Sequence, residues 1–123
     1  MKCNVKFTET ANADLRDIAL YIAERSKDKQ PAIRFVKAVR EKCMILETAP
    51  ESGALPKDRV LISSGYRFLV HDNYLIFYYY TKEDNTAYIT AIFNAKRDYN
   101  ISVVELQKYD SILSAVVAPP YGE

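Results

Sequence analysis

The side chains best suited to chemistry are cations and a tyrosine that flank predicted strands in the second half of the chain. An arginine can hold a phosphate through two parallel hydrogen bonds and stabilise negative charge that develops on it. A lysine or tyrosine beside such cations can assist proton transfer, because neighbouring positive charge lowers its pKa. Brought together by a sheet, these side chains would form a cationic site for a phosphate-bearing substrate. The set comprises Lys57, Arg59, Arg67, Lys96, Arg97 and Tyr99.

Spacing alone also allows a purely structural interpretation of the same residues. Arg97 and Asp98 would then end a strand with surface charges, and Arg67 would pair with Asp72 or Asp98. Both interpretations stay open at the level of the sequence.

Other catalytic patterns are missing from the sequence. It contains no GxSxG, no phosphate-binding loop, no dinucleotide-binding fingerprint and no HExxH. With His71 as its one histidine it offers no obvious Ser-His-Asp triad, and neither a metal site nor a cofactor is expected. Cys3 and Cys43 form no CxxC pair, so we expect two buried, reduced thiols. The carboxylates on the outward face of a predicted helix are expected to be solvated: Asp14, Asp17 and Glu24.

Composition indicates one globular domain, since 49% of the 123 residues are hydrophobic and 27% are charged. The 17 Lys and Arg nearly balance the 16 Asp and Glu. Residues 9–47 carry 8 cations and 7 anions, and residues 57–99 carry 6 and 5. We therefore expect no strongly basic face, which disfavours bulk attraction to nucleic acid. No signal peptide or membrane span is apparent, so a soluble cytoplasmic protein is expected.

The first half of the sequence predicts a strand followed by two helices. Residues 2–7 alternate in polarity as a half-buried strand does, and Thr8 offers an oxygen to cap a following helix. Apolar residues then recur at helical spacing, first over residues 11–22 and again from Pro31 to residue 46. The polar run SKDKQ between them is short, so the two helices are expected to form an antiparallel hairpin.

The second half predicts three strands, over residues 66–71, 74–81 and 87–94, because these segments are rich in β-branched and aromatic residues. Short polar turns between them give a meander, and a right-handed crossover would place the first strand parallel to a later one. The helix hairpin should cover one face of this sheet. Beyond Tyr99, apolar residues at helical spacing predict a third helix, which would cover the other face, dock on a partner or order only in a complex. Its stripe is Val103, Leu106, Tyr109, Leu113, Val116 and Val117.

This layout, with PESG at 50–53, GYRFLVHDNYLIFYYY at 65–80 and ITAIFNAKRDY at 89–99, resembles the RelE/ParE superfamily of type II toxin–antitoxin toxins. The opening KFTETANADLRDIALYIAE is similar to the first strand and helix of that superfamily. The resemblance implies an α+β fold in which an N-terminal strand and an α-helical hairpin pack on a small, mostly antiparallel four-stranded sheet. Residues 1–99 would be the toxin domain, and residues 100–123 an additional C-terminal helical extension.

The superfamily has two branches with different targets. RelE-like members cut mRNA in the ribosomal A site, and for them the resemblance implies Arg67, Arg97 and Tyr99 as catalytic residues that activate the RNA 2′-hydroxyl and stabilise the phosphate. ParE-like members inhibit DNA gyrase and need no nuclease site. Asn94 stands where many relatives have a histidine, and an amide cannot act as a general base. The residues implied for target binding are Lys57, Arg59, Arg67, Asn94, Lys96 and Arg97.

The PxxG, GYRxLV and YxIFY segments favour the ParE-like branch, and hence a toxin that arrests growth by binding gyrase. Two alternatives stay open, namely a ribosome-dependent mRNA endoribonuclease and a non-toxic, degenerate member that only binds a partner. No small-molecule cofactor and no membrane partner is expected under any of them.

All three hypotheses imply a cognate antitoxin protein, whose segment folds as it wraps the helix hairpin and the sheet edge. We expect exposed aromatic residues to anchor it and arginines to meet its acidic residues. Residues 100–118 are a competing occupant of the same groove. The candidate anchors are Tyr21, Tyr78, Tyr80, Arg34 and Arg40.

Overall fold

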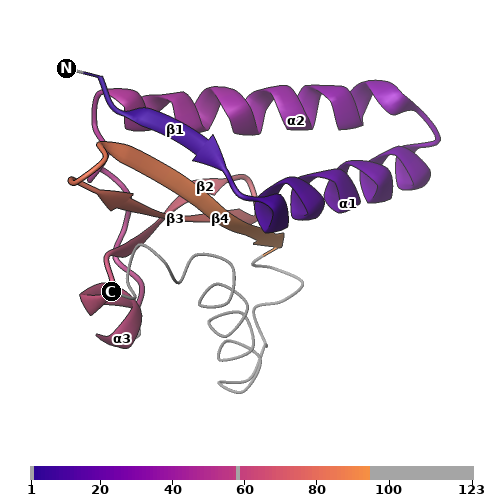
Figure 1. Cartoon of the computed structure of the whole chain (residues 1–123). Coiled ribbons are helices and arrows are strands. Elements are labelled where there is room, and N and C mark those ends of the chain that lie inside the picture. Colours follow the sequence, from indigo (N-terminus) through magenta and orange to yellow (C-terminus); the bar gives the residue numbers. More distant parts are fainter. Residues whose placement is uncertain (1, 58, 95–123) are drawn as a thin grey trace.

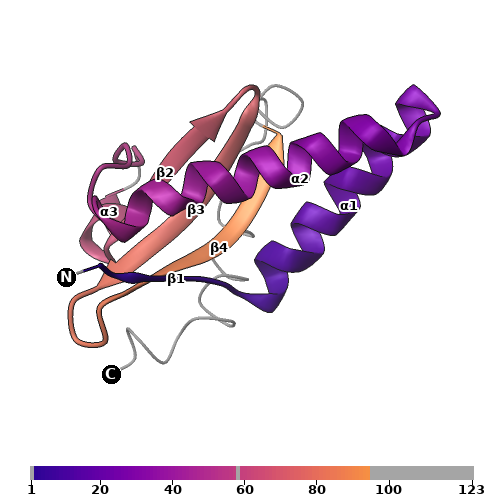
Figure 2. The same cartoon turned by 90° about the horizontal axis from the view of Figure 1, so that it is seen from above.

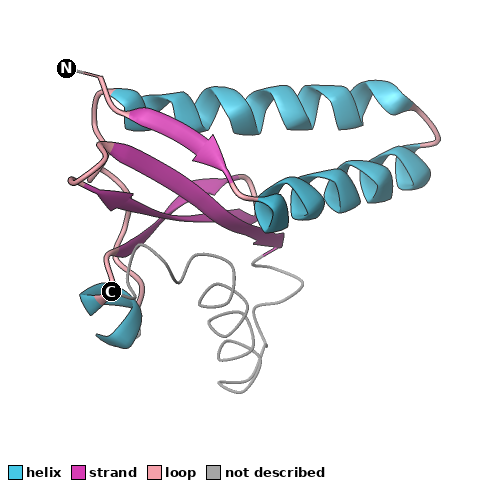
Figure 3. Ribbon diagram, viewed as in Figure 1, coloured by secondary structure: helices cyan, strands magenta, loops and turns pink. Residues whose placement is uncertain are grey.

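The computed structural model describes residues 2–57 and 59–94, which form a four-stranded sheet with a helix hairpin on one face (Figure 1). The predicted C-terminal helix lies outside the described residues. Strands, helices and turns are distinguished by colour in Figure 3. In chain order the elements are β1 (Asn4–Phe7), α1 (Glu9–Ser26), α2 (Lys29–Cys43), the 3-10 helix η1 (Met44–Glu47), α3 (Arg59–Ser63), β2 (Tyr66–His71), β3 (Tyr74–Thr81) and β4 (Thr86–Asn94).

The hairpin of α1 and α2 is confirmed, and side chains fix both of its helix starts. The Thr8 hydroxyl accepts a hydrogen bond from the backbone N–H of Ala11 at 3.1 Å. The Asp28 carboxylate does the same for Gln30 at 3.0 Å, so α2 begins two residues before the predicted Pro31. The chain turns at Lys27, whose φ of 55° lies in the left-handed region. The tip of the hairpin projects beyond the sheet (Figure 2).

The sheet has the strand order β1-β4-β3-β2. As predicted, β2, β3 and β4 form an antiparallel meander, and β1 lies parallel to β4 because the helix hairpin connects them. The register shifts between Phe77 and Tyr78, where Thr90 is the extra residue on β4 and donates its hydroxyl to the Phe77 carbonyl at 3.2 Å. Because of this extra residue, the apolar side chains of β4 before and after the bulge still face either the helix-side core or the aromatic face of the sheet.

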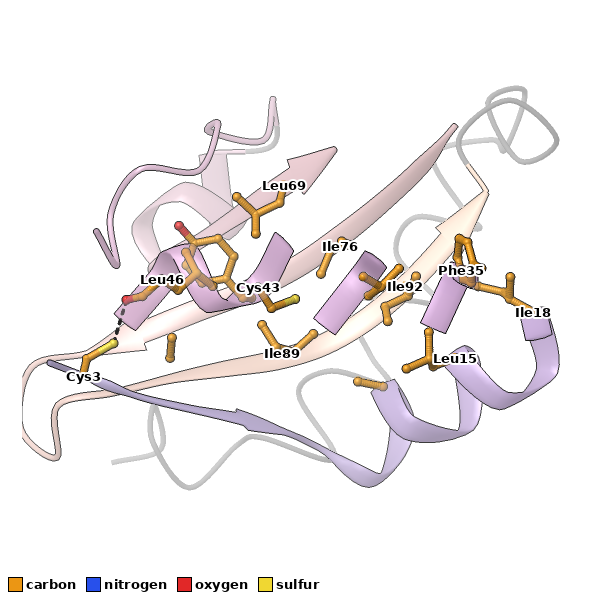
Figure 4. Close-up of a cluster of buried hydrophobic side chains, with 14 residues drawn as sticks. Cys3, Leu15, Ile18, Phe35, Cys43, Leu46, Leu69, Ile76, Ile89 and Ile92 are labelled. Carbon is orange, nitrogen blue, oxygen red and sulfur yellow. Dashed lines mark hydrogen bonds between the residues drawn. The ribbon is translucent and has the colours of Figure 1, made fainter. Parts of the chain in front are cut away.

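The main core lies between the sheet and the helix hairpin (Figure 4). Leu15 of α1, Val39 of α2 and Ile76 of the sheet represent the contributing elements, and each is 3% exposed or less. Cys3 and Cys43 are buried free thiols, as predicted, and the Cys3 thiol donates to the Leu46 carbonyl at 2.9 Å (Figure 4). Burial raises the pKa of Cys43 to about 12 and that of Cys3 in the same direction, so both are poor nucleophiles.

The second face of the sheet is aromatic. Stacked ring pairs run across it, with centroids of Phe68 and Phe77 5.6 Å apart and those of Phe77 and Phe93 5.4 Å apart. Leu61 of α3 packs against this cluster. The sequence did not predict α3, because its five residues are too few to show a helical period.

Helix α1 also completes the edge of β4 beyond the end of β1. The backbone N–H of Thr8 donates to the Ile89 carbonyl at 3.0 Å, and the backbone N–H of Ile92 donates to the Asp14 carboxylate at 3.0 Å. Asp14 is therefore partly buried, and the prediction of a solvated carboxylate was wrong for it. Burial raises its pKa to about 6, opposed by the Ile92 hydrogen bond and assisted by the negative charge of Asp17.

Among the described residues, no helix is both long enough and apolar enough to cross a membrane. The same part of the chain holds no group of three or more His, Cys, Asp or Glu side chains placed to bind a metal ion.

Candidate functional site

Arg67 on β2 is tied to the loop that precedes α3. Its guanidinium nitrogen Nη1 donates to the carbonyl of Gly53 at 3.0 Å, and the backbone N–H of Gly53 donates to the hydroxyl of Tyr78 at 2.9 Å. Arg67 and Tyr78 are register partners on β2 and β3, so both side chains point to the helix face of the sheet. The sequence-level pairing of Arg67 with Asp72 is not formed. Instead the guanidinium holds a backbone carbonyl.

Gly53 has to be glycine in this arrangement. A Cβ atom at this position would lie 2.6 Å from the Tyr78 hydroxyl and 2.9 Å from the Phe68 carbonyl, which is too close for either contact. Two backbone hydrogen bonds between Ala54 and Phe68, at 2.8 and 2.9 Å, also join the loop to the edge of β2. The loop before α3 is therefore held against the sheet at Gly53 and Ala54.

The buried tyrosine in this cluster does not supply a base. Burial raises the pKa of Tyr78, although the Gly53 amide and the Arg67 charge oppose the rise. The hydroxyl therefore keeps its proton near neutral pH. Tyr78 is 0% exposed, so the prediction that it is an exposed partner anchor was wrong.

The structure does not bring the predicted cationic set together within the described residues. Arg67 aligns through Tyr78 with Ile89 of β4, so Asn94 lies five residues further along the sheet, roughly 15 Å away in the strand direction. Lys57 and Arg59 are exposed on either side of the start of α3. Lys96, Arg97 and Tyr99 lie outside the described residues.

A basic surface that the sequence analysis missed runs along α2. This helix carries five cations and one anion, a net charge of +4, whereas α1 carries two cations and four anions. In the sum over residues 9–47, the negative net charge of α1 offsets much of the positive net charge of α2. The expectation of no strongly basic face was therefore wrong for α2. Counting charge helix by helix would have shown it. We call Arg34, Lys37 and Arg40 the α2 basic stripe.

The α2 basic stripe is exposed and unpaired within the described residues, where the one ion pair joins His71 and Asp72 at 3.6 Å. At 100° per residue, the three cations fall within a sector of about 120° of the helix surface. Ile33 and Met44 lie in the same sector and are each 51% exposed. Glu41, the one anion of α2, is exposed in the same sector, so this surface is mostly basic with apolar side chains and one carboxylate.

A cavity of about 470 Å³ opens beside this stripe, between the hairpin and the turn from β2 to β3. Arg34 lies at its rim together with Asp72, and Phe35 packs against the Tyr74 ring at a centroid distance of 4.8 Å and against His71 at 5.9 Å. We call this cavity the hairpin–turn pocket. It is lined by Ile22, Pro31, Arg34, Phe35, Ala38, His71, Asp72, Asn73 and Tyr74.

The remaining predicted anchors lie in different places. Tyr21 is 41% exposed on α1, beneath the guanidinium of Arg25 at 5.7 Å. Tyr80 is half-buried and donates to the Asn85 side chain at 2.9 Å. Arg40 stacks over the Phe7 ring at 5.3 Å. Only Arg34 among them lines the hairpin–turn pocket.

Comparison with known proteins points to one family. The model described as "ParE toxin of type II toxin-antitoxin system, parDE" matches residues 5–99, which spans the described fold from the second residue of β1 to the end of β4. No curated protein matches the sequence.

Solved structures of toxin–antitoxin complexes share the fold, and two of them illustrate the likeness. The toxin–antitoxin complex RelBE2 from Mycobacterium tuberculosis matches with a TM-score of 0.57 and 24% identity, covering 76% of this chain and 99% of that one. The chromosomal ParDE TA system from P. aeruginosa matches with a TM-score of 0.59 and 20% identity, covering 76% and 96%. At these identities the likeness concerns the fold, and it agrees with the predicted RelE/ParE-like architecture.

Proposed function

The chain belongs to the ParE toxin family of type II toxin–antitoxin systems, and from this premise we propose that it arrests growth by binding DNA gyrase and is neutralised by a cognate antitoxin. The proposed gyrase-binding residues remain those of the sequence analysis, Lys57, Arg59, Arg67, Asn94, Lys96 and Arg97. No cofactor takes part in this mechanism.

The observation that carries a binding rather than a cutting mechanism is the hydrogen bond from Arg67 to the Gly53 carbonyl, 3.0 Å long. A guanidinium has five N–H donors, and bidentate recognition of a phosphate uses two of them side by side. In Arg67 one Nη1 donor is engaged with the loop, which orients the guanidinium towards a backbone carbonyl. Asn94 cannot take a proton from a 2′-hydroxyl, and it lies far from Arg67 along the sheet. The described residues therefore favour a binding surface over an endoribonuclease site.

Induction of the protein in growing cells separates the two targets. We expect altered plasmid supercoiling and broken DNA while mRNA stays intact. Codon-level cleavage of mRNA with unchanged DNA would replace the gyrase mechanism with the RelE-type one. Unaffected growth would reject both and leave a partner-binding protein.

A substitution tests the surface independently of the target. Arg97→Ala should abolish growth arrest under either mechanism, because Arg97 belongs to both proposed sets. Lys82→Ala, which removes an exposed cation in the turn between β3 and β4, is the matched control and should leave arrest unchanged. Equal arrest by both variants would remove Arg97 from the site.

A further inference from the structure

We propose that Asp14 of α1 is a positioning residue for the target-binding end of β4, because its carboxylate holds the backbone of Ile92 two residues before Asn94. This inference rests on the proposed function, since Asn94 belongs to the proposed gyrase-binding residues. The sequence continues from Asn94 directly into the segment that carries Lys96 and Arg97. A residue that fixes the end of β4 also fixes the point from which that segment starts.

The end of β4 lacks a neighbouring strand on one side. The parallel pairing of β1 with β4 ends at Phe7 and Ile89, and the chain then leaves the sheet to enter α1. The backbone N–H of Thr8 still donates to the Ile89 carbonyl at 3.0 Å. Beyond this point no strand of the described residues lies beside residues 90–94 on the β1 side. This stretch is the one that leads to Asn94.

The Asp14 carboxylate supplies the missing acceptor. Its oxygen Oδ2 lies 3.0 Å from the backbone nitrogen of Ile92 and accepts the hydrogen bond of that N–H, across 78 positions of the sequence. Ile92 is 2% exposed, so its N–H needs an acceptor within the protein. A carboxylate is a stronger acceptor than a neutral oxygen. The side chain thus takes the place of the next strand residue at the edge of the sheet.

Helix α1 holds this carboxylate in a fixed place. The helix has 18 residues, and the Thr8 hydroxyl caps its start. Ala11 and Ile18 lie three residues before and four residues after Asp14, so they share its side of the helix. Both are buried in the core between α1 and the sheet, with exposed fractions of 0% and 8%. An acceptor carried by a packed helix is positioned more precisely than one carried by a loop.

The other side of the end of β4 is held by β3, but the pairing between the two strands is interrupted. After the bulge at Thr90, β4 pairs with β3 from Ala91 to Asn94. A short terminal stretch that is paired on one side only opens locally at little cost in free energy. We therefore expect the Asp14 contact to keep this stretch from opening, and the binding surface to depend on it.

Hydrogen exchange of backbone amides, followed by NMR on the full chain, tests the structural half of the inference. Asp14→Ala removes the acceptor, so the Ile92 amide should exchange faster by about tenfold or more. The Ile89 amide lies within the β1–β4 pairing, and its exchange rate should stay unchanged. Asp14→Asn keeps an acceptor oxygen and should bring the Ile92 rate back close to that of the unmodified chain. An unchanged Ile92 rate in the Ala variant would overturn the inference.

Inhibition of purified gyrase tests the functional half, at a temperature where circular dichroism shows every variant to be folded. Asp14→Ala should raise the concentration of the chain that half-inhibits supercoiling by about tenfold or more, because the binding surface is no longer preorganised. Asp14→Asn should restore the inhibition. Asp17→Ala removes an exposed carboxylate one turn further along α1, and this matched control should inhibit like the unmodified chain. A purely structural role would lower the unfolding temperature without changing the half-inhibiting concentration.

Asp14→Glu provides a second test, since it keeps the charge but displaces the acceptor by one CH₂ group, and it should also weaken inhibition. Equal losses in the Ala and Asn variants would assign the effect to the charge and overturn the inference. Unchanged inhibition by the Ala and Glu variants would overturn it as well. In both cases the proposed function stands, because the unmodified chain inhibits gyrase. If the unmodified chain leaves gyrase active, the proposed function itself fails, and the positioning role fails with it.

Discussion

At the scale of single residues, the described part of the site is organised by contacts between residues far apart in sequence. The Gly53 carbonyl accepts a hydrogen bond from Arg67 of β2, and the Gly53 N–H donates one to Tyr78 of β3. Gly53 also has no room for a side chain. One donor of Arg67 holds the Gly53 carbonyl, a contact that no local pattern in the sequence predicts.

Gly53→Ala should therefore destabilise the fold. The added Cβ would meet the Tyr78 hydroxyl at 2.6 Å and a backbone carbonyl at 2.9 Å, so Tyr78 or the loop must move. We expect a loss of about 1–3 kcal/mol in the free energy of unfolding, as for other overpacked cores. Urea denaturation measures it, with Ser52→Ala at the neighbouring exposed position as control. Equal urea midpoints for the two variants would show that the loop accommodates the added Cβ without loss of stability, and would contradict the prediction.

Asp14 gives the second prediction at this scale, and its sign follows from the raised pKa of about 6. The folded state binds the proton more tightly than the unfolded state does, so stability is greatest when Asp14 is protonated and falls as the pH rises from about 4 to about 7. Asp14→Asn keeps an oxygen to accept from the Ile92 amide and carries no charge.

The Asn variant should therefore be more stable than the unmodified chain at pH 7, by roughly 1–2 kcal/mol, which is less than the full shift implies because the side chain is partly exposed. The two proteins should converge in stability near pH 4. Urea midpoints measured across this pH range decide the matter. A constant difference between the proteins at all pH values would contradict the assignment.

At the scale of elements, Thr8 links the start of α1 to the edge of β4 beyond the end of β1. Its hydroxyl caps the helix by accepting from Ala11 and also lies 3.5 Å from the Thr90 carbonyl. Thr8→Ala should cost about 1 kcal/mol, the usual loss of an N-cap. Thr8→Ser retains the hydroxyl and should stay within a few tenths of the unmodified chain. Thermal unfolding compares them, and equal losses in both variants would assign the effect to the methyl group instead.

The elements themselves were largely predictable. The boundaries of β2 and β3 agree with the prediction, and β4 begins one residue earlier, because alternation and short polar turns define strands locally. Helix α3 was not predicted, and α2 was predicted to begin at Pro31 although Asp28 caps it earlier. Hydrophobic spacing and polar turns predict the elements themselves. At the end of an element, however, more than one residue can serve as the cap or the first helical position, so its boundary is less certain to predict.

The candidate site was less predictable than the fold for a physical reason. The sequence predicted Arg67 and Arg34 as functional cations, but it could not predict the contacts of the residues around the site, which depend on tertiary structure. Arg67 meets a carbonyl 14 residues away, and Asp14 meets an amide 78 residues away. The α2 basic stripe could have been predicted by counting charge over that helix alone. It was missed because the charges of two helices were summed together.

At the scale of the whole molecule, the two faces of the sheet differ. One face packs on α1 and α2 through aliphatic side chains, and the other is an aromatic layer to which α3 contributes Leu61. A helix of five residues is too small to cover three strands. Residues 103–117 lie outside the described residues, and packing of their apolar stripe on this aromatic face stays one of three sequence predictions, beside docking on a partner and ordering only in a complex.

Full-length variants test that prediction without truncating the chain. Leu106→Asp combined with Leu113→Asp places two charges in the predicted stripe, whereas Gln107→Asp combined with Ser114→Asp places the same charges one residue away from it. If the segment packs on the sheet, the first pair should lower the urea midpoint and increase binding of an apolar dye, because charges cannot be buried against aromatic rings without a large desolvation cost. The second pair should change neither quantity. Identical behaviour of the two pairs would mean that the stripe contributes nothing to the folded chain, and that residues 100–123 await a partner instead.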